Sequence, residues 1–142
     1  MVNRPDYLDN LLDYLGGPTV PVLRDADATL FETHGSRFLS FVAPARGSME
    51  MCAWRLTVPA GSEGVPHRPT RDEVLLVLDG RLRATLDGTF TELVRGDVLH
   101  IPAGAEVQIG AGADGATAWV TTTPGLEAVM KDGSRMRPPW TL

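Results

Sequence analysis

The sequence predicts an all-β fold made of short strands. Apolar segments rich in Val, Leu, Thr and aromatic residues follow one another along most of the chain. Glycine, proline and Asp-Gly turn signals separate these segments, and no convincing helical pattern interrupts the series. Short strands at regular spacing, joined by such turns, are typical of β-sandwiches and barrels. We therefore expect one β-domain, preceded by a short N-terminal helix.

Length, composition and charge fit this expectation and exclude several classes of function. A chain of 142 residues with 43% hydrophobic residues is sufficient for one domain with a single core. The net charge of -5 comes without long basic runs, which argues against a nucleic-acid partner. A single cysteine excludes an internal disulfide and suits a reducing compartment. Without an apolar signal segment or membrane-length run, the sequence predicts a cytoplasmic protein with no membrane partner.

Residues 1–35 are predicted to form an N-terminal helix and arm. A helical pattern begins near Pro5 and ends at a Gly-Gly pair, with apolar positions at Leu8, Leu11, Leu12 and Leu15. A helix this short is marginal in isolation, so its leucine face requires a partner surface. We expect it to dock on the outside of the barrel or on a partner subunit.

The strands are placed by alternation and by turn residues. Asp79-Gly80 and Asp87-Gly88 predict tight hairpins, because these residue types tolerate the positive φ of such turns. Residues 111–115 are predicted to form a flexible loop, and residues 124–142 a C-terminal tail packed on the barrel, with a short helical turn near 126–130. The predicted strands are 37–43, 49–58, 73–78, 81–86, 89–94, 98–101, 105–109 and 117–123.

The segment from Val74 to Leu78 is apolar at every position. An antiparallel strand of this kind must be covered on both faces. One face would line the barrel interior, and the other would be covered by the N-terminal helix or by a second subunit. The segment therefore favours a homodimer, with the helix as the alternative cover.

Two motifs give a more specific prediction. In the first, Gly61, His67, Glu73 and Gly80 follow the spacing of the first conserved motif of small cupins, with Pro69 where a second histidine is usual. The second motif of that family is matched by three residues and broken by one valine: Gly96, Pro102, Gly104 and Val107, the last standing in place of a histidine. The chain thus resembles a small single-domain cupin with a degenerate metal site.

The resemblance covers roughly residues 36–123 and implies a double-stranded β-helix, the cupin jelly-roll barrel, with a site in the barrel mouth. In typical members the two motifs supply three histidines and a glutamate that hold a divalent metal. Here only His67 and Glu73 remain. A protein metal site usually needs at least three donors, so no resident cofactor is expected unless His100 or His34 joins. Alternation points His100 outward. Iron, manganese, nickel or zinc would be the candidates.

Without a metal, His67 and Glu73 form a candidate acid/base pair. A neighbouring carboxylate can orient an imidazole and favour its protonated form, which would suit proton transfer in an isomerase, cyclase or lyase. In this hypothesis His67 transfers the proton and Glu73 orients the ring. The alternative is that both residues are inherited remnants that satisfy each other or nearby arginines.

Four residues are candidates for binding a small-molecule substrate: Arg55, Trp54, Met51 and Val107. Arg55 would clamp a carboxylate or enolate if its side of the strand is the barrel interior, and would be an ordinary solvated residue if the Trp54 side is the interior. Trp54 and Met51 would be pocket walls for an aromatic or polyketide-like ligand, or simply core residues.

The sequence therefore leaves three hypotheses for the function. The favoured one is a metal-independent isomerase, cyclase or lyase acting on a small organic molecule. The second is a metal-dependent, dioxygenase-like enzyme with an irregular ligand set. The third is a non-catalytic module that binds or senses a small molecule, or a structural partner of another enzyme.

Overall fold

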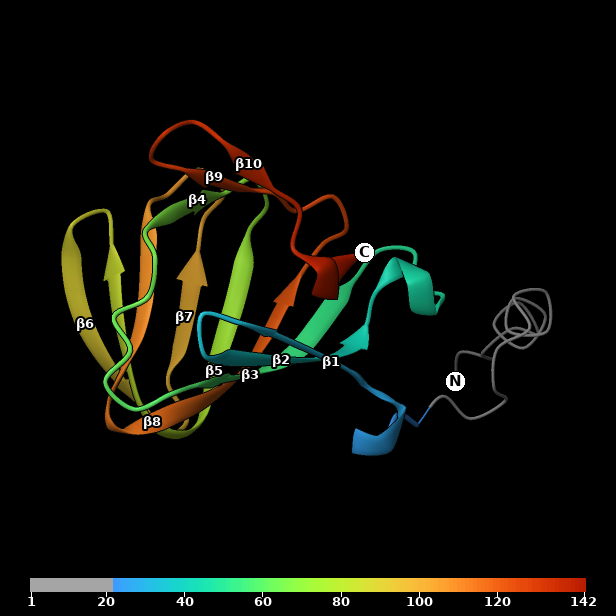
Figure 1. The fold of residues 1–142 in the computed structure, drawn as a ribbon, viewed down its shortest axis with the longest axis horizontal. Coiled ribbons are helices and arrows are strands. Elements are labelled where there is room, and N and C mark those ends of the chain that lie inside the picture. Colours follow the sequence, from blue (N-terminus) through green and yellow to red (C-terminus); the bar gives the residue numbers. More distant parts are fainter. Residues whose placement is uncertain (1–21) are drawn as a thin grey trace, which may run out of the picture.

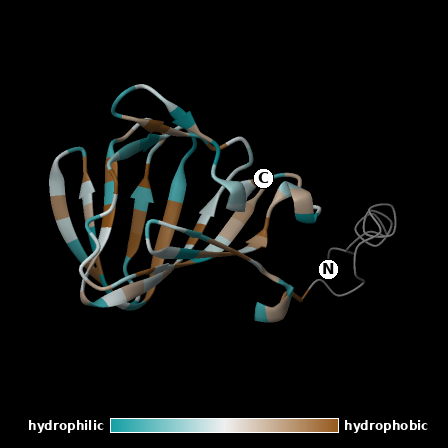
Figure 2. Ribbon diagram, viewed as in Figure 1, coloured by the Kyte–Doolittle hydropathy of each residue, from teal (hydrophilic) through white to brown (hydrophobic). Residues whose placement is uncertain are grey.

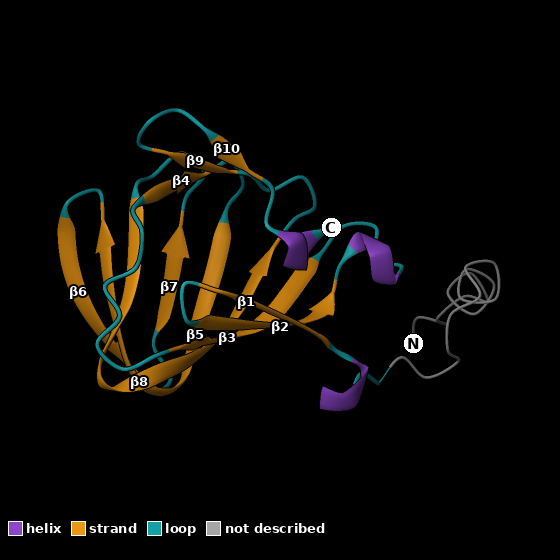
Figure 3. Ribbon diagram, viewed as in Figure 1, coloured by secondary structure: helices purple, strands orange, loops and turns teal. Residues whose placement is uncertain are grey.

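A computed structural model describes residues 22–142, so the helix predicted near Pro5–Leu15 lies outside the described residues. The all-β prediction is confirmed, because strands make up most of this part of the chain and only three short 3-10 turns interrupt them (Figures 1 and 3). The strands are β1 (Thr29–Thr33), β2 (Ser36–Val42), β3 (Cys52–Val58), β4 (His67–Pro69), β5 (Glu73–Leu86), β6 (Thr89–Val94), β7 (Val98–Ile101), β8 (Val107–Thr122), β9 (Ala128–Met130) and β10 (Arg135–Met136). The turns are η1 (Asp25–Asp27), η2 (Pro44–Arg46) and η3 (Pro139–Thr141).

The strands form one curled sheet in the order β1-β2-β3-β8-β4-β9-β10, and β5 pairs with β6, β7 and β8. β4, β9 and β10 lie across one end of the curled sheet (Figure 1). Hydrophobic residues follow the strands, and hydrophilic residues gather at many of the turns (Figure 2). None of the helical segments within residues 22–142 has the length and apolar character needed to cross a membrane.

Two long strands replace four of the predicted short ones. The hairpin expected at Asp79-Gly80 is wrong, because β5 continues through these residues, and the loop expected at 111–115 is wrong, because β8 continues through it. β5 and β8 pair antiparallel on both sides of a bend at Gly80, with register shifts before and after it. Gly80 has a φ of 75°, and a Cβ added there would lie 2.2 Å from the carbonyl oxygen of Gly115. Glycine at this position therefore permits a close backbone contact as well as the turn in direction.

A register shift accompanies the bend in β5. Val77 pairs with Ala118 of β8, but the next pair joins Asp79 to Thr117, so β5 carries one extra residue at this point. An extra residue in a strand exchanges the inward and outward positions beyond it. Leu75 and Val77 accordingly face inward before the bulge, and Leu82 faces inward after it. The second predicted hairpin, at Asp87-Gly88, is confirmed between β5 and β6.

The apolar core lies between the curled halves of the sheet and draws on most of the central strands. Trp54 belongs to this core with a stripe of alternating β3 residues, as alternation predicts. Cys52, on the same stripe, is fully buried with its thiol 3.5 Å from the carbonyl oxygen of Thr141. Burial raises the pKa of this thiol.

The C-terminal residues close one end of the core. The helical turn expected near 126–130 is wrong, since this segment contains β9, which pairs with β4 and β10. The last turn, η3, buries Trp140, whose ring stacks on Phe38 with centroids 3.7 Å apart. Ser40 donates a hydrogen bond of 2.8 Å to the Trp140 carbonyl oxygen, which fixes the turn against β2.

Candidate functional site

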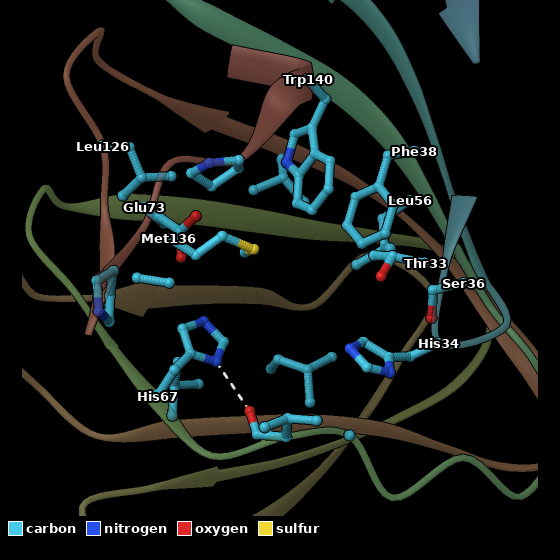
Figure 4. A pocket seen from close by; sticks show the side chains of 18 of the residues that line it. Thr33, His34, Ser36, Phe38, Leu56, His67, Glu73, Leu126, Met136 and Trp140 are labelled. Carbon is cyan, nitrogen blue, oxygen red and sulfur yellow. Dashed lines mark hydrogen bonds between the residues drawn. The ribbon is translucent and has the colours of Figure 1, made fainter. Parts of the chain in front are cut away.

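A mainly apolar cavity of about 220 Å³ lies at the end of the barrel closed by β4, β9 and η3. Val107 of β8, which replaces the usual histidine, lines this cavity and is almost fully buried. The titratable side chains that line it are those of His34, His67, Glu73 and Glu127, and the first three are labelled in Figure 4. Its apolar walls include Phe38, Leu56, Leu75, Ile101, Val107, Val120, Leu126, Met136 and Trp140.

Glu73 provides a buried carboxyl group inside this apolar cavity. It is the first residue of β5, opposite Ile101 of β7, and only 9% of its surface is exposed. No hydrogen bond or ion pair joins its carboxyl group to another of the residues from 22 to 142. Burial raises the pKa of Glu73 to about 7, because the charged form is poorly solvated there. Below that pH the group is chiefly a neutral carboxylic acid.

His67 reaches the same cavity from β4, where its backbone lies opposite Val107 and Met130. Its Nδ1 is 2.9 Å from the carbonyl oxygen of Val65. A carbonyl oxygen can only accept, so Nδ1 carries the hydrogen, and in the neutral ring Nε2 is left with a lone pair. Figure 4 shows this second nitrogen on the cavity side of the ring.

This arrangement corrects the role predicted for Glu73. The backbone of Val65, and not the carboxyl group of Glu73, holds the His67 ring, and no hydrogen bond between the two side chains occurs in the described structure. The two groups instead face one cavity as separate partners (Figure 4). The protonated carboxyl group of Glu73 can act as a proton donor, and Nε2 of His67 can act as a proton acceptor when the ring is neutral.

Three residues of the β1–β2 turn also line the cavity: Thr33, His34 and Ser36. The motif spacing indicates His34 only as a possible additional metal ligand and gives no sign of the two hydroxyl groups. The available signal was the His-Gly pair between two alternating segments, which favours a two-residue hairpin. What it could not show is that this hairpin folds over the cavity with the imidazole turned inward (Figure 4).

The predicted substrate-binding residues divide into two groups. Val107 lines the cavity, whereas Trp54 is a buried core residue outside the cavity wall, with its ring edge-on to Trp140 at 6.3 Å between centroids. Arg55 and Met51 are not part of the cavity wall, which corrects their predicted placement. The Trp54 side of β3 is the interior, so Arg55 lies on the outer side. There it forms an ion pair of 3.0 Å with Asp25.

The residues present do not fit the four-ligand metal site that the sequence resemblance implies. Pro69 and Val107 line the cavity at the two positions where histidine is usual, and neither side chain has a donor atom. His100 is on the surface, with Nε2 3.0 Å from a carboxylate oxygen of Asp72, and does not line the cavity. Among residues 22–142, no three His, Cys, Asp or Glu side chains come together as a metal site.

The comparisons with known proteins agree with this architecture. The model of the cupin domain family matches residues 54–123 of the chain. Comparison with curated proteins gives no match.

Solved structures with a similar fold include the polyketide cyclase RemF from Streptomyces resistomycificus, which is 16% identical with a TM-score of 0.65 over 74% of this chain and 82% of RemF. KdgF from a Halomonas species is 16% identical with a TM-score of 0.63, over 72% of this chain and 93% of that chain. An oxalate decarboxylase variant from Bacillus subtilis is 18% identical with a TM-score of 0.66, over 97% of this chain and 40% of that chain. At these identities the likeness concerns the fold.

Proposed function

Because the chain is a small cupin superfamily protein with a jelly-roll fold, we propose that it binds a small organic molecule in the barrel-end cavity and acts on it as a metal-independent isomerase, cyclase or lyase. The observation that carries the proposal is the buried carboxyl group of Glu73, which faces the same apolar cavity as Nε2 of His67. A raised carboxyl pKa at a site that also contains a suitable base is characteristic of acid/base catalysis.

The chemistry follows from the two protonation states. His67 Nε2 takes a proton from a carbon next to a carbonyl group, while the Glu73 carboxyl group gives its proton to the carbonyl oxygen. The resulting enol then takes the proton from His67 at another carbon, attacks a second carbonyl group whose oxygen takes that proton, or expels a leaving group that takes it. In each case the enol O–H group returns its proton to Glu73. These outcomes correspond to isomerisation, cyclisation and elimination, and each returns His67 and Glu73 to their starting states.

The size and lining of the cavity limit the ligand. An apolar cavity of about 150 Å³ is large enough to bind benzene. At about 220 Å³, this cavity suits a skeleton of one or two rings or a short folded chain. RemF, which by its name cyclises a polyketide, shares the fold and supports ring closure as one member of the proposed reaction class.

The proposal can be tested without knowledge of the natural substrate. With 2-acetylnaphthalene as a probe in deuterated buffer, NMR measures how fast the methyl protons next to the carbonyl group exchange. We expect the protein to accelerate this exchange, and His67→Gln and Glu73→Gln each to lower the acceleration by about 10²–10⁴-fold. The matched control is His100→Gln, since His100 is exposed on the surface and outside the cavity. Equal exchange by the wild-type protein and both cavity variants would contradict the proposal.

The same probe separates the rival functions. A binding or sensor module is favoured by the apolar cavity closed by Trp140, and it would show a rise in melting temperature with the probe but no exchange. A metal enzyme would contain near-stoichiometric iron, manganese, nickel or zinc when purified without chelator, and would lose it in His67→Gln. Either result would replace the acid/base proposal.

A further inference from the structure

We propose that the β1–β2 turn forms a second polar subsite, which binds an oxygen-bearing end group of the ligand, such as a carboxylate, hydroxyl or carbonyl. The subsite consists of Thr33, His34 and Ser36, which line the cavity together. This inference rests on the binding part of the proposed function and is independent of whether the protein catalyses a reaction. It predicts a ligand with an apolar skeleton and an oxygen function remote from the reacting carbon.

The turn is built so that these three residues reach the cavity. Thr33 and Ser36 are paired across the hairpin, and His34 and Gly35 between them have φ values of 50° and 78°. Positive φ at both central residues is the geometry of a tight two-residue hairpin. Outside the turn, Glu32 and Arg37 are paired with each other at 3.4 Å and do not line the cavity. The conformation thus places the solvent-exposed His34 at the wall of the cavity and the charged pair outside it.

Figure 4 shows the position of this subsite relative to the acid/base pair. The His34 ring points into the cavity from the side opposite Glu73 and His67, with Thr33 and Ser36 close behind it. Apolar side chains form most of the remaining wall, and Phe38 and Leu56 lie beside the turn (Figure 4). A ligand that spans the cavity would therefore contact polar groups at both ends and apolar walls along its length.

The chemistry of the turn selects an acceptor oxygen. An imidazole donates at least one N–H in either protonation state, and each hydroxyl group can donate as well. The described structure gives the side chains of Thr33, His34 and Ser36 no hydrogen-bond partner. Of the two carboxyl groups that line the cavity, Glu73 belongs to the opposite side, and Glu127 is 3.5 Å from a guanidinium nitrogen of Arg135. Donors without a competing carboxylate favour a ligand oxygen at the turn.

Two probes of similar size test this inference by calorimetric titration: 2-naphthoate, which carries an oxygen group, and 2-methylnaphthalene, which carries none. At pH 6, below the pKa of about 7 for Glu73, the carboxyl group of that residue does not repel the anion. We expect the wild-type protein to bind 2-naphthoate at least tenfold more tightly than 2-methylnaphthalene. His34→Gly should remove this preference without added backbone strain, because glycine tolerates positive φ. His34→Asn, which also tolerates this conformation and keeps an N–H donor, should restore part of it.

The control is Arg37→Gln, a polar change in the same hairpin on the side away from the cavity, which should leave the tenfold preference intact. Equal binding of the two probes by the wild-type protein, an unchanged preference in His34→Gly, or no binding of either probe would overturn the inference. The test is separate from that of catalysis. A protein that shows the His34-dependent preference but no proton exchange keeps the subsite and loses the proposed reaction, and the reverse result keeps only the reaction.

Discussion

The two halves of β5, before and after the bend at Gly80, differ in what their inner and outer sides contact. Before the bend at Gly80, the inner side carries the carboxyl group of Glu73, which faces the barrel-end cavity. After the bend, inward Leu82 and Ala84 are almost completely buried and do not line that cavity. One strand thus contributes to a ligand site at one end of the barrel and to a filled core at the other.

The outer sides differ as well. The first half exposes apolar side chains, with Val74 44% and Leu78 38% exposed. The second half exposes arginines, and Arg81 is paired with Glu92 of β6 at 2.8 Å. A charged surface is stable in contact with water, whereas an exposed apolar surface favours burial by another segment or subunit. The candidate ligand site and the exposed apolar surface therefore lie on opposite sides of the same half of β5, the half before Gly80.

The largest effect is expected in the filled half. Leu82→Ala removes a fully buried side chain and should lower the free energy of unfolding by about 2–5 kcal/mol, since the close-packed surroundings only partly collapse. Leu78→Ala, in the same strand but on the outer side, should cost less than about 1 kcal/mol. Urea denaturation of both variants measures the difference. Similar losses in the two variants would contradict the placement of Leu82 in the packed core and of Leu78 on the exposed outer side.

The next effect concerns the cavity half and depends on pH. The folded state raises the pKa of Glu73 from 4.5 to about 7, so between these values it retains a proton that the unfolded chain releases. The contribution of Glu73 to stability is therefore complete below about pH 4.5 and is lost as the pH rises to about 7, a loss of about 3 kcal/mol. Glu73→Gln should abolish this loss, which urea denaturation at pH 5 and pH 8 would detect.

Glu92→Gln provides the control for that experiment, because Glu92 lies on the outer side of the filled half and pairs with arginines. Its substitution should leave the fall in stability between pH 5 and pH 8 in place. If Glu73→Gln and the wild-type protein lose the same stability over this range, the buried carboxyl group is ionised in the folded protein and is not the proton donor proposed above.

The smallest effect on stability is expected on the outer side of the cavity half, where we propose that a second copy of the chain packs to form a homodimer. Val74→Asp should change the free energy of unfolding of one subunit by less than about 0.5 kcal/mol, since the site is exposed. It should nevertheless halve the mass measured by sedimentation equilibrium. Arg83→Gln, on the outer side of the other half, should leave the mass unchanged. A monomeric wild-type protein would contradict the dimer and leave residues 1–21 as the candidate cover.

Most of the strands could be predicted because alternation and turn residues are local signals. Alternation also placed Trp54 and Arg55 on opposite sides of β3, but it could not tell which side is the interior. The Asp79-Gly80 pair was misleading for a physical reason: glycine with positive φ serves a hairpin and a strand bend equally well. Here the contact with Gly115, distant in sequence, determines which of the two forms.

The site could be predicted only in part. The motif spacing identified His67 and Glu73, and both line the cavity. The partner of the His67 ring is a backbone carbonyl group, which no pattern of side chains reveals. The contribution of His34 to the cavity depends on how the β1–β2 hairpin folds over the barrel. The contribution of Trp140 depends on where the C-terminal segment packs. Such long-range placements are set by tertiary packing and not by local sequence.

The buried thiol of Cys52 can be used to measure local opening of the structure around it. The thiol has no solvent-exposed surface, and it lies against the carbonyl oxygen of Thr141 in the turn that carries Trp140. An alkylating reagent can reach the sulfur only when that turn lifts or the core opens. If alkylation is faster than global unfolding, its rate therefore measures how often the turn η3, which carries Trp140, moves away from the cavity.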